Sequence, residues 1–141
     1  MFEARVQPQC FDIAAEHVRL QRLGPQVGAI VSFTGQVRDE PLMLEHWPGA
    51  AERRMAAILA QARTRWPLLG AITIHRYGLL PVGDPIVLVL TASAHRAAAF
   101  DAASFLMDWL KTDAPFWKRD STGWVEAKAS DDAAAARWRQ G

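Results

Sequence analysis

Residues 85–119, PIVLVLTASAHRAAAFDAASFLMDWLKTDAPFWKR, carry the pattern that decides the fold. The run PIVLVLTA is continuously apolar, which is typical of a central β-strand. An amphipathic stretch follows, and Ser93 is placed to cap its N-terminus. The helix predicted there has a buried stripe at helical spacing, made of Phe100, Ala103, Met107 and Leu110. Pro115 ends the helix, and the residues after it predict two short strands around Thr122-Gly123.

The remaining chain alternates in the same way between strand and helix patterns. Strands are expected at 3–7, 28–37, 42–47 and 71–78, and helices at 13–22, 50–66 and 130–139. The run GAIVSFTGQV within 28–37 predicts a buried strand that Gly35 ends or bulges. This order of elements predicts an α+β fold in a single domain that spans residues 1–141.

Composition narrows the class of protein. The chain has 141 residues, half of them hydrophobic, a net charge of +1 and one cysteine. With one cysteine, neither an internal disulfide nor a cysteine-based zinc site is expected. A reducing, cytoplasmic location is expected instead. No apolar run approaches the ~20 residues that span a bilayer, so no membrane association is expected. The near-zero net charge argues against a nucleic-acid-binding domain, which usually carries a basic excess.

Five potential cations lie at the two ends of the helix expected before Pro115. His95 and Arg96 open it, Lys111 closes it, and Lys118 and Arg119 follow the break. Free N–H groups at a helix N-terminus bind anions, and a phosphate there would also meet a guanidinium and an imidazole. The alternative is a solvated helix start with ordinary polar residues. Lysine near a helix C-terminus is likewise favoured by electrostatics alone, so both interpretations stay open.

Other polar residues give weaker signals. Arg38 follows the strand at 28–37, where loops often carry function, although a surface arginine explains it equally well. His17, His46 and His75 show no metal-ligand spacing, and His75 is interpreted as an ordinary strand histidine. Cys10 has no histidine near it in the sequence. No glycine-rich phosphate loop or nucleophile elbow is present, and we expect neither a metal nor a cofactor.

Successive blocks of the sequence resemble one known family, the large, catalytic subunit of molybdopterin synthase. These blocks are VSFTGQVRD, LEHWPGAAE, RWPL, ITIHRYG, TASAHR, FLMDWLKTDAPFWKR and WVEAKASD. They occur in order from about residue 26 to Trp138, and SAHR followed at this spacing by LKTxAPFWKR is highly specific. The resemblance implies an α/β-hammerhead fold with additional antiparallel strands.

The resemblance also implies an activity and a partner. The family converts cyclic pyranopterin monophosphate to molybdopterin by inserting two sulfur atoms as a dithiolene. Each sulfur arrives as a thiocarboxylate on the C-terminal glycine of a small ubiquitin-like subunit, whose tail enters a pocket on the large subunit. Two large subunits form a homodimer with one small subunit at each end, which makes a heterotetramer.

The family's functional positions match particular residues of this chain. The resemblance implies Lys111 and Lys118 as the catalytic pair. It implies substrate-binding roles for Gln36, Val37, Arg38, His95, Arg96, Arg119 and Asp120. The chain departs from the family in three places: many relatives carry lysine at Gln36 and glutamate at Asp120, and the loop between Arg38 and Leu44 is short.

The cations at the two ends of this helix indicate an anion-binding pocket, and the resemblance implies that it brings two anions together, the substrate phosphate and the thiocarboxylate. Such a meeting requires cations, because each close ion pair contributes about 4 kcal/mol before desolvation at an effective dielectric constant of about 20. We assign Arg38, His95 and Arg96 to the phosphate. One of Lys111 and Lys118 would hold the thiocarboxylate and the other would move protons, in an order that the sequence leaves open. The main alternative is a non-catalytic module that docks a ubiquitin-like tail.

Overall fold

The computed structural model describes residues 1–112, 116–120, 123–125 and 138 of the chain. The described helices and strands follow one another in this order: β1 (Phe2–Gln7), α1 (Ile13–Gln21), β2 (Ala29–Gln36), β3 (Leu42–His46), α2 (Ala50–Arg65), β4 (Leu68–Arg76), β5 (Gly78–Leu80), β6 (Pro85–Ser93), α3 (Arg96–Thr112), β7 (Phe116–Asp120) and β8 (Gly123–Val125).

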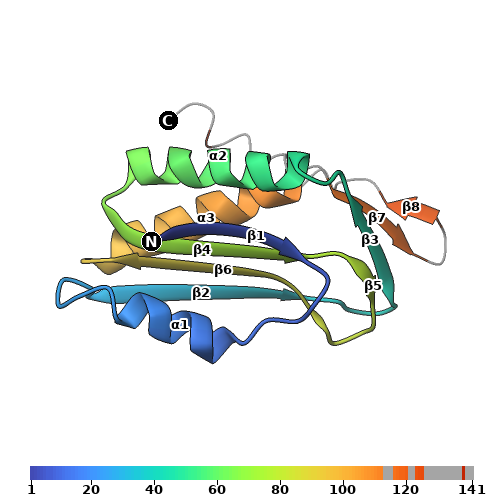
Figure 1. Cartoon of the computed structure of the whole chain (residues 1–141), viewed down its shortest axis with the longest axis horizontal. Helices are drawn as coiled ribbons and strands as arrows, with labels where there is room; N and C mark the ends of the chain where they lie inside the picture. Colours follow the sequence, from blue (N-terminus) through green and yellow to red (C-terminus); the bar gives the residue numbers. More distant parts are fainter. Residues whose placement is uncertain (113–115, 121–122, 126–137, 139–141) are drawn as a thin grey trace.

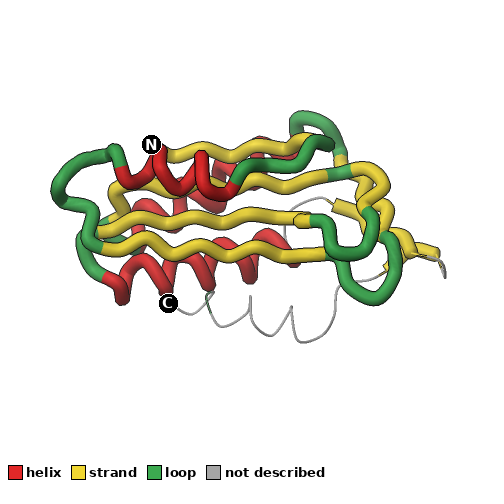
Figure 2. Tube along the Cα trace, turned by 90° about the horizontal axis from the view of Figure 1, so that it is seen from below, coloured by secondary structure: helices red, strands yellow, loops and turns green. Residues whose placement is uncertain are grey.

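A four-stranded sheet with the strand order β1-β4-β6-β2 lies at the centre of the molecule and is called sheet A here. β1 runs parallel to β4, while β6 is antiparallel to both β4 and β2. Helix α1 covers one face of sheet A, and α2 and α3 cover the other (Figure 1). Figure 2 shows α1 lying in front of the strands, with the other two helices behind them.

The alternation of side chains along β4 supplies both hydrophobic layers of sheet A. Ile72 and Ile74 point towards α1 and pack with its fully buried Leu20. Ala71 points the other way, into the core beneath α2 and α3. His75 follows the same alternation as Ala71, so its side chain also lies on the face that α3 covers.

A second sheet, called sheet B here, has the order β5-β3-β7-β8 and is antiparallel throughout. It stands at the end of sheet A where α3 finishes (Figure 1). A small cluster of Val37, Leu44 and Leu80 packs between the two sheets. The α+β class and the additional antiparallel strands expected from the sequence are confirmed.

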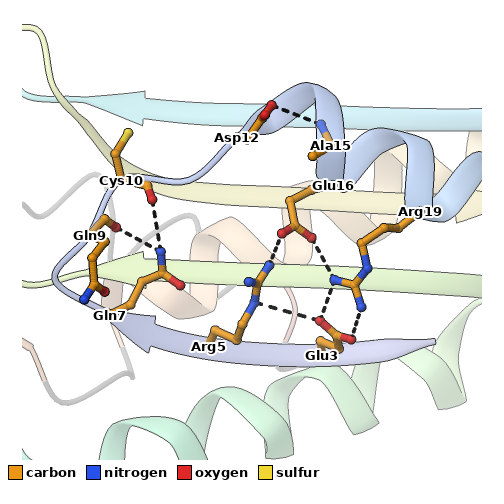
Figure 3. Close-up of polar contacts among 9 residues, drawn as sticks. All are labelled: Glu3, Arg5, Gln7, Gln9, Cys10, Asp12, Ala15, Glu16 and Arg19. Atoms are coloured by element: carbon orange, nitrogen blue, oxygen red, sulfur yellow. Dashed lines mark hydrogen bonds and ion pairs between the residues drawn. The ribbon is translucent and has the colours of Figure 1, made fainter.

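Local contacts explain where two of the helices begin and how one is held. Asp12 caps α1, since its Oδ1 accepts a hydrogen bond of 3.1 Å from the backbone N–H of Ala15. Charged side chains then bind α1 to β1, as Figure 3 shows. Arg19 donates to Glu3 and to the buried Glu16, and Arg5 pairs with Glu16 from the strand. At α2, the backbone N–H of Gly49 donates to Glu52 Oε2 over 2.6 Å.

The structure corrects two expectations about α3. Ser93 is not a helix cap: it is the buried last residue of β6, and its hydroxyl donates to the carbonyl of Pro67 over 2.9 Å. The helix begins later, at Arg96, so His95 precedes it. Phe100 is 60% exposed and lies outside the buried stripe, because Ala99, Ala102 and Phe105 occupy the positions that face the sheet.

Other expectations about the strands are corrected as well. β2 is an edge strand of sheet A, half-buried along most of its length, rather than the buried strand that its apolar run predicts. The expected disturbance at Gly35 is confirmed as a register shift between Gly35 and Gln36. Strand β5 was not anticipated. The helix expected at 130–139 and the break at Pro115 fall outside the described residues. None of the described helices combines the length and hydropathy needed to cross a membrane.

Candidate active site

A cavity of about 110 Å³ opens where sheet A, sheet B and the end of α3 meet. Its lining residues come from β2, β4, the start of β6, α3 and β7, and they are Phe33, Gly35, Gln36, His75, Ile86, Val87, Met107, Leu110, Lys111, Phe116 and Lys118. Most of these side chains are apolar. The few polar groups converge on one space. A mainly apolar cavity with a few convergent polar groups is typical of a small-molecule binding site.

The wall formed by β2 requires a glycine. A Cβ atom at Gly35 would lie 2.8 Å from Cγ1 of Val87 on the neighbouring strand, closer than two carbon atoms can approach. The register shift follows at once, between Gly35 and Gln36. Such bulges redirect side chains next to functional sites. Here the shift ends the regular pairing of β2 with β6 just where Gln36 reaches the cavity.

Two lysines reach the cavity from different elements. Lys111 is exposed near the C-terminal end of α3, where a positive charge is favoured by the helix dipole. Lys118 is half-buried on β7, and it pairs through its backbone with Leu44 of β3. Phe116 and Lys118 are two residues apart on a strand, so both point to the inner face of sheet B. These two cations share the cavity that the sequence predicted for them.

His75 forms the floor of the same cavity and is 6% exposed. Its ring stacks on Phe116, with 3.7 Å between ring centroids and 12° between planes. Nδ1 lies 2.8 Å from the carbonyl oxygen of Arg76, so it carries the proton and donates to that oxygen. Burial lowers the pKa of His75 to about 4; the hydrogen bond to the Arg76 carbonyl opposes this shift, and the nearby Lys118 and His46 add to it. The imidazole is therefore neutral at pH 7.

The other predicted anion-binding pair lies at the opposite end of α3. His95 and Arg96 are both exposed and do not line the cavity. An α-helix rises about 1.5 Å per residue, so the helix separates the backbones of Arg96 and Lys111 by roughly 22 Å. Within one chain, these cations do not meet around a shared ligand.

The remaining candidates also lie around the cavity rather than in its wall. Arg38 is 78% exposed and lies 3.9 Å from the carboxylate of Asp39. Val37 is buried between the sheets and pairs through its backbone with Gly83 and Asp84. Arg119 is exposed on β7, which turns it to the outer face of sheet B. Asp120 pairs with Gly123 through the backbone, and its side chain lies outside the described residues.

Sequence reasoning missed the aromatic and imidazole part of the site. Phe33, His75 and Phe116 line the cavity, yet none of them was a predicted site residue. One signal was available for His75. It is a polar residue at the end of the otherwise apolar strand run AITIH, and a buried polar group at a strand end calls for a partner or a function.

The fold and the cavity define a class: an α+β domain with a mainly apolar, small-molecule-sized cavity that two lysines line. Comparison with known proteins identifies the family. Residues 6–113 match the family model described as "MoaE protein", and this chain belongs to that family.

Relatives agree with this assignment over nearly the whole chain. A "Molybdopterin synthase catalytic subunit" from Mesorhizobium japonicum is 52% identical over 96% of this chain and 92% of the relative. The solved structure of "Molybdopterin cofactor biosynthesis protein E" from Burkholderia multivorans is 47% identical, with a TM-score of 0.87 over 99% of this chain and 97% of that one. Molybdopterin synthase from Staphylococcus aureus is 30% identical, with a TM-score of 0.72 over 86% and 90%.

Proposed function

We propose that this chain is the catalytic subunit of a molybdopterin synthase and acts as a sulfurtransferase. It would transfer sulfur from the C-terminal thiocarboxylate of a small ubiquitin-like subunit to cyclic pyranopterin monophosphate, in the cytoplasm. The observation that carries the proposal is the convergence of Lys111 and Lys118, from two different elements, on one mainly apolar cavity. The names of the relatives support it, since a catalytic subunit implies a second, non-catalytic one.

The two lysines suit the chemistry of the acyl group. When sulfur leaves the acyl carbon for the substrate, that carbon must gain an oxygen from water, and the tail ends as a carboxylate. Negative charge develops on the acyl oxygen during this step. A lysine ammonium group close to that oxygen stabilises the charge, and the apolar walls strengthen the interaction by excluding water. The second lysine is then free to move a proton between water and the substrate.

The substrate phosphate requires further cations, which we assign to Arg38, His95 and Arg96. Since α3 holds Arg96 far from Lys111 in one chain, we propose that His95 and Arg96 serve the cavity of a second copy in a homodimer. Exposed aromatic residues on the same side support a contact between copies: Phe33 on β2 and Phe100 on α3 are 41% and 60% exposed. With one small subunit at each end, the assembly is a heterotetramer.

Reconstitution from purified components tests the proposed function. The chain is mixed with cyclic pyranopterin monophosphate and a small subunit carrying the thiocarboxylate, and molybdopterin is measured together with the tails consumed. We expect two tails to be converted to carboxylate for each product molecule. A small subunit with an ordinary carboxylate is the control and yields no product. Tight binding of the tail without turnover would instead identify a non-catalytic docking module.

A further inference from the structure

His75 has a ring nitrogen that the contacts of the fold leave unused. Nδ1 donates to the carbonyl of Arg76, which fixes the tautomer and leaves Nε2 with a lone pair. Nε2 has no hydrogen-bond partner among the residues that the structure describes. The residue is only 6% exposed, and it lines the cavity. Nε2 is not sealed in the core but accessible from the cavity, where a ligand or water can satisfy it.

The surroundings of His75 keep it an acceptor. The groups packed around the ring are Val6 and Val87 on the neighbouring strands, Phe116 on its face, and Met107 and Leu110 from α3. In the described part of the chain, the charged or titratable groups near it are Lys111, Lys118 and His46, none of which is acidic. Among the residues that the structure describes, only the Arg76 carbonyl favours an imidazolium ion, and burial outweighs it, so Nε2 is an unprotonated acceptor at neutral pH.

The polar groups of the cavity therefore divide into two kinds. A lysine ammonium group donates and cannot accept, so Lys111 and Lys118 bind the anionic parts of a ligand. Among the described residues that line the cavity, Gln36 and His75 supply the side-chain acceptors. Gln36 is exposed at the rim, whereas His75 is buried. A ligand that reaches the floor of the cavity consequently meets one fixed, neutral acceptor.

We propose that His75 is a specificity-determining residue whose Nε2 accepts a hydrogen bond from an N–H or O–H group of the pterin substrate. This inference rests on the proposed function and adds to it a contact that neither lysine makes. A pterin ring carries amide and amino N–H donors, whereas a thiocarboxylate or a cyclic phosphate monoanion carries none. His75 thus recognises the pterin and not the anionic groups, and it distinguishes the substrate from a simple anion.

Two matched variants separate the acceptor from the structural role of the ring. The amide of His75→Asn can still donate to the Arg76 carbonyl but is too short to reach the position of Nε2. The longer His75→Gln places an acceptor near that position. Both are assayed in the complete enzyme with the thiocarboxylated small subunit. We expect KM for the pterin to rise roughly tenfold in His75→Asn and to stay within about threefold of wild type in His75→Gln.

KM for the thiocarboxylated subunit is the internal control, and it stays unchanged in both variants if the contact is to the pterin. Equal pterin KM values in the Asn and Gln variants would overturn the inference. A shifted pH profile of kcat with unchanged pterin KM would also overturn it, because His75 would then act on Lys118. If His75→Asn does not fold, His75→Phe replaces it, since phenylalanine keeps the stack on Phe116 without an acceptor. Failure of the wild-type chain to make product refutes the proposed function instead.

Discussion

The imidazole of His75 lies flat against the ring of Phe116, with 3.7 Å between their centroids. This contact joins the end of β4 in sheet A to the start of β7 in sheet B. His46 adds a third ring, with its centroid 6.1 Å from that of Phe116 and 4.2 Å from that of Tyr77. Lys118 lies two residues beyond Phe116 on the same face of β7. The stack of rings therefore fixes where this lysine enters the cavity.

Burial of His75 makes the stability of the fold depend on pH. Its pKa is about 4 in the folded protein and about 6.5 in an unfolded chain. Between these values the unfolded chain binds a proton that the folded protein does not, so stability rises with pH in this window. We expect the free energy of unfolding to fall by about 3 kcal/mol from pH 6.5 to pH 4 on account of His75. Urea denaturation across this range measures the loss.

His75→Gln is the control for this prediction, because glutamine does not titrate. The slope of stability against pH between 6.5 and 4.5 should flatten in the variant, whatever its absolute stability. Carboxylates affect stability at lower pH. The hydrogen bond from Arg19 lowers the pKa of Glu3, so the stability that ionised Glu3 contributes is present above pH 4.5 and is lost as the pH falls further. Identical slopes for wild type and variant would show that His75 does not titrate as its burial requires.

Lys111→Ala should abolish turnover and leave the fold intact. Lys111 is exposed and supports no core contact, but it lines the cavity from α3. We expect kcat to fall by at least about 10²-fold, since a cation next to the developing acyl charge is lost. The melting temperature should stay close to that of wild type. Arg22→Ala, which removes an exposed cation at the end of α1, is the matched control and should retain full activity. A well-folded Lys111→Ala enzyme with normal kcat would remove Lys111 from the mechanism.

Gly35→Ala should destabilise the protein and deform the cavity wall. Its Cβ would lie 2.8 Å from Val87 Cγ1, and valine has little freedom to move aside. Overpacking of this kind costs about 1–3 kcal/mol. Val87→Ala removes the obstructing methyl group, so the double variant should be more stable than the sum of the single effects by about 1 kcal/mol. Strict additivity in urea denaturation would mean that the two residues do not clash.

Much of the fold was predictable because local patterns agree with the tertiary structure. Asp12 caps α1 as expected, and the apolar spacing of α2 places Met55, Ile58 and Leu59 in the core. The errors arise where tertiary contacts override local preference. Ser93 has the residue type of a cap, but the chain extends β6 through it to reach the Pro67 carbonyl. Phe100 has the right spacing for the core, yet the small residues around it let α3 pack closely with another side inward.

The site was predictable in part for a similar reason. Lys111 and Lys118 were identified because charged residues near helix and strand ends stand out in a sequence. His75 and Phe33 were not, because their importance comes from neighbours that are distant in the chain. The tautomer of His75 depends on the Arg76 carbonyl. Its burial depends on Phe116, which is distant from it in the sequence. Such contacts between distant residues cannot be predicted from residue type and spacing alone.

Arg96→Ala should weaken binding of the phosphate-bearing substrate in a salt-dependent manner. Arg96 is the first residue of α3 and is exposed, so its loss leaves the fold unchanged. Its attraction for a phosphate is screened at high ionic strength, where the Debye length shrinks to about 3 Å at 1 M salt. The affinity difference between wild type and variant should therefore be large at low salt and small at 1 M. Equal affinities at low salt would exclude Arg96 from the phosphate site.

Mixing two impaired variants, at low salt and at a substrate concentration too low to saturate Arg96→Ala, tests whether Arg96 acts on the cavity of a second copy. If one site uses Lys111 from one copy and Arg96 from the other, a mixed dimer of Lys111→Ala and Arg96→Ala contains one intact site and one site lacking both residues. Random exchange of subunits makes half of the dimers mixed, so about a quarter of wild-type activity should return when both variants start near zero. Co-expression with two affinity tags allows the mixed dimer to be purified and its kcat/KM measured directly. If both residues instead belong to the same chain's site, every site in the mixture lacks one of them, and the activity stays at the average of the two variants. The roughly 22 Å that α3 places between these residues makes the first outcome the expected one.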